Sequence, residues 1–196
     1  NSFIPSRIKS DKNVKKVFYH QLKNIIKDSD EKLGGVPTVI GEFGIPFDLN
    51  NKRSYKNGDF SSQAEALDLY YQIIEELFLD STIWNYTSDN SNERGDLWND
   101  EDLSIFSRDQ QVDPDNIYSG GRGLNAIVRP HLRLISGDPR RQSFDYRRKE
   151  YTLLFEDQND GELLVFVPEY QYPRGFRVEF ESGKWELNVE KQELRV

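Results

Sequence analysis

The hydrophobic positions in the first half of the chain alternate between a helical and an extended spacing. Between residues 11 and 28, apolar residues recur every three or four positions, which predicts an amphipathic helix. The apolar run 36–41 predicts a short buried strand, and residues 82–87 predict a second strand. Between the strands, a second helix is predicted to begin at Ser62–Glu65, which has the capping-box pattern. This alternation of helices and strands favours parallel βαβ units.

The segments around these elements are polar and rich in turn-forming residues. Residues 48–60 are predicted to form a loop. Residues 88–115 are predicted to form a second, long loop, whose apolar side chains indicate that it is ordered and packed. Residues 116–132 predict a further helix that is weakened by three glycines.

The second half of the chain has short apolar runs separated by turn residues. This pattern predicts an all-β sandwich module that begins near residues 134–142, so we divide the chain into residues 1–134 and 135–196. A tight turn is expected at Ser182–Gly183. The expected strands are residues 144–146, 151–155, 163–167, 176–180 and 185–189.

The composition of the 196-residue chain argues against several classes of protein. A net charge of −8 argues against a nucleic-acid partner, because nucleic-acid-binding proteins cluster Lys and Arg. The chain has no cysteine and only two histidines, which argues against thiolate sites, histidine-rich metal clusters and a Ser-His-Asp triad. We therefore expect no cofactor and no metal. No apolar run approaches the roughly 20 residues of a membrane span, so we expect a soluble protein and leave open whether it is secreted.

Glu42 is the first candidate for chemistry, because it stands at the end of the first predicted strand between two glycine-containing turns. Burying an unpaired carboxylate costs several kcal/mol, so a core has no use for one at this position. Catalytic side chains of βα barrels lie at the C-terminal ends of the strands. The alternative is a strand-end glutamate that simply meets solvent.

Trp84 is the second candidate, because it lies in the second predicted strand. In a parallel sheet, Glu42 and Trp84 would project toward the same rim. A carboxylate beside a flat aromatic ring suits sugar chemistry, in which the carboxylate attacks an oxocarbenium-like centre and the indole packs on the pyranose. The alternative for Trp84 is an ordinary core aromatic residue.

The acidic stretch 93–104 is the third candidate, but its spacing does not match an EF-hand. Asp96, Asn99 and Asp102 are candidates for hydrogen bonds to sugar hydroxyls, and a solvated loop with local Asx turns is the alternative. The basic residues of 140–149 indicate either a solvated face or contact with a lipid surface.

Several of these segments together resemble glycoside hydrolase family 5, in the branch of endoglycoceramidases and microbial glucosylceramidases and steryl-β-glucosidases. The resemblance rests on Gly-Glu-Phe-Gly-Ile-Pro-Phe-Asp around Glu42, on residues 55–63, on Trp84-Asn85-Tyr86, on residues 95–107, and on Ile127-Val128-Arg129-Pro130. It covers roughly residues 36–132, and the β module more loosely. Residues 95–107 are its most specific part, since Glu-Phe-Gly is shared by many cellulase-like enzymes.

The resemblance implies a retaining β-glycosidase, with the last βα units of a (β/α)8 TIM barrel followed by a C-terminal β-sandwich. Carried over, Glu42 is the nucleophile and Trp84 the sugar platform, and Asp96, Trp98, Asn99 and Asp102 belong to the substrate-binding loop. The implied partner is a glycolipid or another β-glucoside, such as glucosylceramide, a steryl glucoside or a related glycosphingolipid.

One departure from the family pattern is large. The family's acid/base is a Glu that follows an Asn at the end of strand four, and this chain has no such pair. Retaining hydrolysis needs two carboxyls, and this chain supplies one of them and only about two of eight barrel strands. Since the chain also opens at Asn1 and has no Met, we expect a C-terminal piece that is inactive without the N-terminal part of its barrel.

Two other functions stay open at this point. The chain could be a non-catalytic fragment that binds a carbohydrate or a membrane surface through its β module. It could also come from a polysaccharide endoglucanase, which shares the nucleophile motif. Residues 98–102 and the C-terminal module favour the glycolipid enzymes over the endoglucanase.

Overall fold

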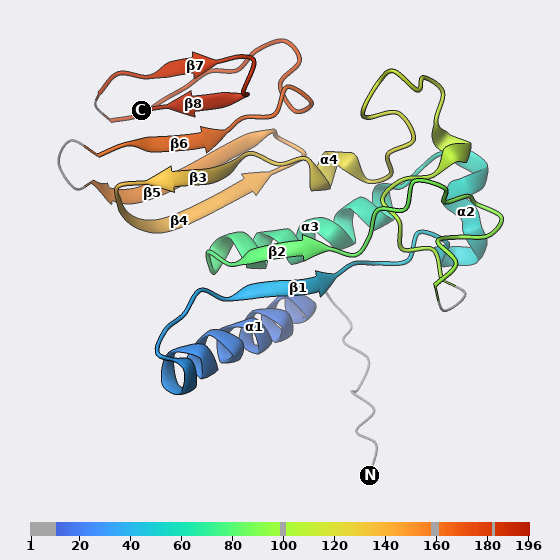
Figure 1. Cartoon of the computed structure of the whole chain (residues 1–196), viewed down its shortest axis with the longest axis horizontal. Coiled ribbons are helices and arrows are strands. Elements are labelled where there is room, and N and C mark those ends of the chain that lie inside the picture. Colours follow the sequence, from blue (N-terminus) through green and yellow to red (C-terminus); the bar gives the residue numbers. More distant parts are fainter. Residues whose placement is uncertain (1–10, 99–100, 158–160, 182) are drawn as a thin grey trace.

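The structure is a computed structural model that describes residues 11–98, 101–157, 161–181 and 183–196. It contains both helices and strands (Figure 1). In chain order the elements are α1 (Asp11–Leu33), β1 (Val39–Phe43), α2 (Leu49–Asn57), α3 (Ser61–Glu76), β2 (Asp80–Ile83), the 3₁₀ helix η1 (Arg108–Gln110), α4 (Leu124–Ile127), β3 (His131–Ile135), β4 (Gly137–Asp145), β5 (Glu150–Asp157), β6 (Leu163–Phe166), β7 (Glu186–Asn188) and β8 (Glu193–Arg195).

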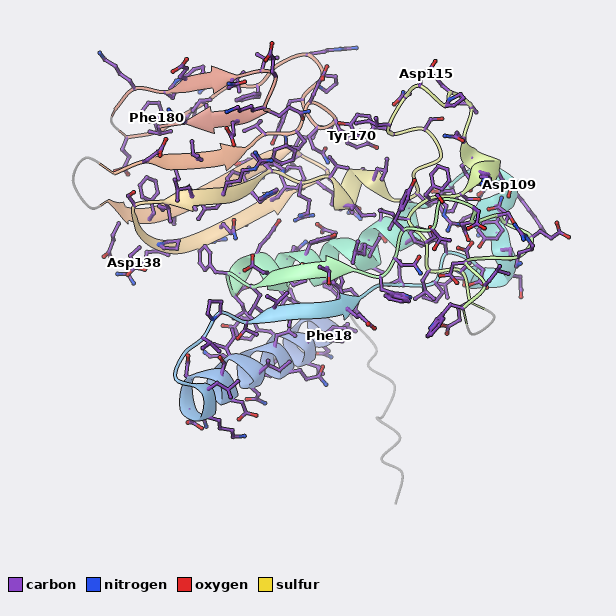
Figure 2. The ribbon with its side chains drawn as sticks, in the orientation of Figure 1. Phe18, Asp109, Asp115, Asp138, Tyr170 and Phe180 are labelled. Carbon is purple, nitrogen blue, oxygen red and sulfur yellow. The ribbon has the colours of Figure 1, made fainter. Side chains whose placement is uncertain are left out.

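The first part of the fold is a parallel pair of strands with two helices. β1 and β2 pair in parallel, with Val39 opposite Asp80 and Phe43 opposite Ile83. The chain returns between them through α3, so the predicted βαβ unit is confirmed. Phe18 extends from α1 and packs on Tyr70 of α3 with 4.8 Å between ring centroids (Figure 2). The predicted helix at 11–28 is confirmed and continues to Leu33.

The expectation of a buried first strand is wrong in this chain. The strand is shifted to Val39–Phe43, and Val39 is 56% exposed. β1 pairs only with β2, so within the described residues its other edge carries no strand. The apolar run therefore begins before β1 does, and part of β1 is exposed to solvent.

The predicted loop at 48–60 is also wrong, because it contains α2. Asn50, Asn51 and Lys52 take left-handed backbone angles at its start, a conformation that Asn tolerates better than most residues. The helix ends at Asn57. Gly58 follows as its C-cap with φ 71° and donates its backbone N–H to the carbonyl oxygen of Ser54.

The capping box at Ser62–Glu65 is wrong as well. α3 begins one residue earlier, at Ser61, and no side chain caps it from the N-cap position Phe60. The carboxylate of Asp59 instead accepts the backbone N–H of Ser61 at 3.0 Å. An acidic side chain two residues before the helix start thus satisfies one free N–H group, and Glu65 is left to pair with Arg147.

The middle of the chain is an ordered loop, as predicted, but the helix expected at 116–132 is wrong. Only the single turn α4 forms, and it begins after Gly123, which together with Gly120 takes a positive φ that a helix cannot continue through. A Cβ on Gly120 would overlap the ring of Phe106, and one on Gly121 would overlap Leu124. In Figure 1, α2 and this loop gather beyond the ends of β1 and β2 to which the strand arrows point.

The second part of the fold is built of strands, as predicted. β3, β6, β8 and β7 form a four-stranded antiparallel sheet in that order, and β4 and β5 form a long hairpin. Leu163, Val165, Val167 and Leu194 make its core, against which Tyr151 and Leu153 of the hairpin pack. Two layers of strands therefore enclose one apolar core.

The strands in this part differ from the prediction in several places. Residues 176–180 do not form a strand, although Phe176 and Val178 pack on the core. β3 and β8 were missed, since each has only three to five residues and no long apolar run. β4 extends from Gly137, well before the predicted start at 144. The predicted turn at Ser182–Gly183 lies partly outside the described residues, because Ser182 is not among them.

Candidate active site

Glu42 occupies the fourth position of β1 and its side chain is exposed. The next residue, Phe43, packs its ring on Tyr70 and Tyr71 of α3, with centroid distances of 5.8 and 5.2 Å. Ile40 pairs with Ser81 and Phe43 with Ile83, so Gly41 and Glu42 together stand opposite the single residue Thr82, and Glu42 lies in a bulge of β1. The carboxylate is thus presented at the end of the strand that meets the long loop.

The prediction of a strand at 82–87 is wrong in its bounds, because β2 ends at Ile83, and Trp84 follows β2 at the same end of the sheet. Its backbone N–H donates to the carbonyl oxygen of Phe43 at 2.8 Å, which ties the two strand ends together. A Cβ on Gly44 would overlap the carbonyl oxygen of Trp84, so only glycine permits this close approach. The peptide bond between Trp84 and Asn85 is cis. Phe43 and Gly44, the two residues that follow Glu42, are therefore in direct contact with the backbone of Trp84.

Trp98 comes from the long loop and packs against Trp84. The two ring centroids are 6.0 Å apart with an interplanar angle of 62°, an edge-to-face arrangement. Trp98 is 55% exposed and its neighbour Leu97, which has φ 63°, is 66% exposed. The loop thus adds a second, accessible indole beside the first.

Asp96 organises the loop around these two indoles. Its carboxylate accepts the side-chain amide of Asn85 at 2.9 Å and the backbone N–H groups of Trp98 and Leu103 at 3.0 and 3.3 Å. Both oxygens therefore have protein partners. The predicted contact with a sugar hydroxyl would have to share these oxygens, so the geometry favours a supporting part for Asp96.

Asp102 is buried and lies one step further from the indoles. Its carboxylate receives two hydrogen bonds from the guanidinium of Arg122, at 2.7 and 2.5 Å, and one from the hydroxyl of Tyr55. Burial, together with the bond to Asp102, raises the pKa of Tyr55. With these partners, Asp102 is closed off from a substrate.

The structure thus brings Trp84, Asp96 and Trp98 together around Asn85, and it sets Glu42 on the adjoining strand. Asn99 lies outside the described residues. Arg122 and Tyr55 were not predicted as site residues, since Arg122 lies 20 positions from Asp102 and Tyr55 lies 47 positions from it. The signals in the sequence were the arginine enclosed by Gly121 and Gly123, and the place of Tyr55 in the family-like residues 55–63.

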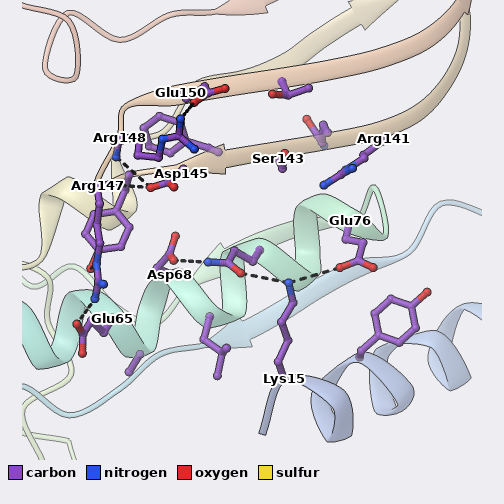
Figure 3. A pocket seen from close by; sticks show the side chains of 18 of the residues that line it. Lys15, Glu65, Asp68, Glu76, Arg141, Ser143, Asp145, Arg147, Arg148 and Glu150 are labelled. Atoms are coloured by element: carbon purple, nitrogen blue, oxygen red, sulfur yellow. Dashed lines mark hydrogen bonds and ion pairs between the residues drawn. The ribbon is translucent and has the colours of Figure 1, made fainter. Parts of the chain in front are cut away.

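An open groove of about 1510 Å³ lies elsewhere, between α1, α3 and the β4–β5 hairpin (Figure 3). Lys15 pairs with Glu76, Arg147 with Glu65 and Arg148 with Glu150, so most of its charges already have partners of opposite sign. None of the predicted site residues lines this groove.

Among the described residues, no group of three or more His, Asp or Glu side chains could hold a metal ion. In the same part of the chain, no helix has both the length and the apolar character that crossing a bilayer requires.

Comparison with known proteins gives a consistent result. Residues 129–196 match the model of the glycoside hydrolase family 5 C-terminal domain. The chain is 31% identical to a glucosylceramidase of Rhizopus delemar over 82% of this chain and 26% of the relative. It is 28% identical to an ergosteryl-beta-glucosidase of Saccharomyces cerevisiae over 94% of this chain and 32% of the relative. The chain thus spans about a quarter to a third of the length of these relatives.

Solved structures agree with the sequence matches. The fold superposes on sterylglucosidase 1 of Cryptococcus neoformans with a TM-score of 0.80 and 26% identity, over 96% of this chain and 31% of that one. Endo-glycoceramidase II of Rhodococcus sp. gives a TM-score of 0.57 at 17% identity, over 92% of this chain and 34% of that one, and shows the fold alone. The resemblance found in the sequence is confirmed: the chain belongs to glycoside hydrolase family 5, and its relatives include proteins named glucosylceramidase, ergosteryl-beta-glucosidase and sterylglucosidase.

Proposed function

We propose that this chain supplies the nucleophile half of the active site of a retaining β-glycosidase that hydrolyses the β-glucosidic bond of a glycolipid. Glu42 is the nucleophile, and Trp84 is the platform for the sugar. The observation that carries the proposal is the hydrogen bond from Trp84 to the backbone of Phe43, which fixes the indole-bearing residue beside the strand end that presents Glu42.

The proposed reaction proceeds by double displacement. The carboxylate of Glu42 attacks the anomeric carbon and forms a glycosyl ester while the bond to the leaving oxygen breaks. A second carboxylic acid, about 5–5.5 Å from the first, protonates the leaving oxygen and then takes a proton from the water that cleaves the ester. That acid/base is a Glu outside this chain. The exposed position of Glu42 supports this arrangement because it leaves room for a substrate, and within the described residues the unpaired edge of β1 leaves room for a further strand.

We also propose that β1 and β2 are the last strands of a (β/α)8 barrel whose other strands come from the rest of a longer protein. The parallel pairing of β1 and β2 through α3 supports this proposal. The division between residues 1–134 and 135–196 stays a proposal. β3, which straddles that boundary, pairs with β6 of the C-terminal sheet.

The proposed substrates are glucosylceramide, a steryl glucoside or a related glycosphingolipid. The printed names of the relatives, glucosylceramidase and ergosteryl-beta-glucosidase, support this substrate class. The two partly exposed indoles support the sugar-binding part, since indole faces pack on the apolar faces of pyranose rings. Contact of the enzyme with a lipid surface is part of the same proposal. In it, Asp96 and Asp102 hold the backbone of the long loop in place through their hydrogen bonds.

The test measures glucose or glycan release from the three lipids by the complete enzyme that contains this segment and by its Glu42→Gln variant. We expect loss of nearly all activity on one lipid, because the amide cannot attack the anomeric carbon. Glu93→Gln, an exposed glutamate on the long loop, is the matched control and is expected to keep its activity. An unchanged rate in Glu42→Gln would remove Glu42 from the mechanism.

A labelling experiment identifies the nucleophile independently. A 2-fluoro glucoside with a good leaving group slows the second step and leaves the sugar on the nucleophile. Mass spectrometry of the digested enzyme should then find the label on the peptide that contains Glu42. A label on a different carboxylate would contradict the assignment, and no label together with no lipid hydrolysis would favour a non-catalytic binding fragment.

A further inference from the structure

Arg122 is one of the largest fully buried side chains of the protein, and every part of its guanidinium is engaged. Two of its nitrogens bond the two oxygens of Asp102, and its Nε donates to the carbonyl oxygen of Ser104 at 3.1 Å. The guanidinium lies 4.4 Å from the centroid of the Phe47 ring, with the rings of Tyr55 and Phe60 slightly further away. A planar fork on an aromatic face is an arrangement that only arginine provides.

The partners of Arg122 hold one short segment, residues 102–105, in place. The carbonyl oxygen of Asp102 accepts the backbone N–H of Phe47 at 2.6 Å. The backbone N–H of Arg122 itself donates to the carbonyl oxygen of Ile105 at 2.8 Å. The segment is thus held at both ends: the side chain of Arg122 binds Asp102, and the backbone of Arg122 binds Ile105.

The same segment brackets Asn85, the residue after Trp84. The backbone N–H of Asn85 donates to Leu103 at 3.1 Å, and its carbonyl oxygen accepts from Ile105 at 2.8 Å. The backbone N–H of Leu103 also donates to Asp96, which in turn accepts the backbone N–H of Trp98. One continuous set of hydrogen bonds therefore runs from Arg122 to the backbone of Trp98 and to the backbone of Asn85, the residue that follows Trp84.

We infer that Arg122 is a positioning residue that sets the geometry of the Trp84–Trp98 pair through residues 102–105. Its effect on catalysis rests on the proposed function, because it requires Trp84 to be the sugar platform. Its effect on the indole pair does not depend on any reaction. Arg122 touches neither the reacting carboxylate nor the open face of β1, so it acts only through the loop.

The first test follows the indole pair directly by circular dichroism. The chain has three tryptophans, and Trp185→Phe, at an exposed position of the β module, leaves only Trp84 and Trp98. Indoles about 6 Å apart couple their transitions, so the pair should give a distinct signal that depends on their angle. In this background, Arg122→Lys is expected to lose most of the signal while the far-ultraviolet spectrum stays that of a folded protein.

Arg129→Lys is the matched control. Arg129 is also buried and also binds carboxylates, but its partners Asp68 and Glu75 lie on α3. A folded Arg129→Lys variant should keep the indole signal. If Arg122→Lys keeps the signal too, or if Arg129→Lys loses it equally, the inference is overturned.

Tyr55→Phe decides the case if Arg122→Lys does not fold. It removes only the hydroxyl that donates to Asp102 and leaves the ring beside Arg122. A reduced indole signal in this variant supports the inference, and an unchanged signal contradicts it.

The second test measures kinetics in the complete enzyme. A misplacement of about 1 Å can lower the rate by about 10²-fold, so we expect Arg122→Lys to lower kcat/KM on that scale, mainly through a higher KM. An altered indole signal with unchanged kinetics would support the positioning role and overturn the assignment of Trp84 to the sugar platform. Lower kcat/KM with an unchanged indole signal would overturn the inference and leave the proposed function standing.

Discussion

Glu75 of α3 receives two hydrogen bonds from the guanidinium of Arg129, at 2.6 and 2.9 Å, across 54 positions of sequence. The same guanidinium bonds Asp68 at 2.7 Å and the carbonyl oxygen of Phe144 in β4 at 3.0 Å. Glu75 also accepts the backbone N–H of Phe144 at 3.2 Å. One buried cluster therefore joins α3, the residues before β3, and the β4–β5 hairpin. This cluster is thus one polar connection between the two parts of the fold.

Removing one member of this cluster should strongly destabilise the protein. Arg129→Met would leave two carboxylates buried without a cation, and breaking a buried pair typically costs about 3–5 kcal/mol. We expect a loss of this size in the free energy of unfolding, measured with urea. Arg140→Met, at an exposed arginine that pairs with Asp138 and Glu156, is the control and should change it by less than about 1 kcal/mol. Equal losses in both variants would contradict the role of the cluster.

Gly44→Ala should destabilise the strand ends, because its methyl group would overlap the carbonyl oxygen of Trp84. The obstacle is backbone that is held by its own hydrogen bond to Phe43, so it cannot swing away as a side chain would. We expect a loss of about 1–3 kcal/mol, with a change in tryptophan fluorescence. Gly41→Ala in the same strand is the control, because nothing lies within 4 Å of its added methyl group. It should change the stability by less than about 0.5 kcal/mol. A neutral Gly44→Ala would show that the approach of the two strands is looser than described.

Ionisation of the buried Tyr71 hydroxyl should lower the free energy of unfolding at alkaline pH. Burial raises the pKa of its hydroxyl from 10.0 to about 12, with a further increase from Glu75 and an opposing effect of Arg129. The unfolded protein therefore releases this proton first, and the free energy of unfolding falls as the pH rises from 10 to 12. Two pKa units correspond to roughly 2–3 kcal/mol.

Tyr71→Phe tests this prediction, since it keeps the ring against Phe43 and removes the hydroxyl. The difference in unfolding free energy between wild type and variant should shrink or change sign between pH 10 and pH 12. Parallel pH profiles of wild type and Tyr71→Phe would contradict the prediction.

The local patterns of the sequence predicted elements well where one periodicity dominates. The heptad-like spacing of Val14, Val17 and Phe18 gave α1, and the apolar run at 163–167 gave β6. The prediction failed where several nearby polar side chains could each bond the backbone at the start of a helix. Asp59 rather than Ser62 satisfies the start of α3, and successive left-handed residues open α2 within a segment that is polar throughout.

The candidate site divides in the same way. Glu42 and Trp84 could be placed at one end of a parallel sheet because strand ends follow from local pattern and topology. The burial of Asp102 could not be predicted, since it depends on Arg122, which lies 20 positions away and approaches it only through the folded loop. Spacing alone could not distinguish an acidic residue that faces a ligand from one that holds a loop together.

Asp96 offers the sharpest test of that distinction. In Asp96→Asn, one oxygen becomes an NH₂ group, so the backbone N–H of either Trp98 or Leu103 faces a donor instead of an acceptor. An unsatisfied group of this kind costs about 1–3 kcal/mol, and we expect a loss of this size in urea unfolding together with a more exposed Trp98 in quenching experiments. Asp89→Asn, at an exposed position of the same loop, should change neither. If Asp96 instead serves mainly to bind sugar hydroxyls, Asp96→Asn will keep its stability and Trp98 exposure and will lose only activity in the complete enzyme. The two measurements together therefore separate a loop-forming carboxylate from a ligand-binding one.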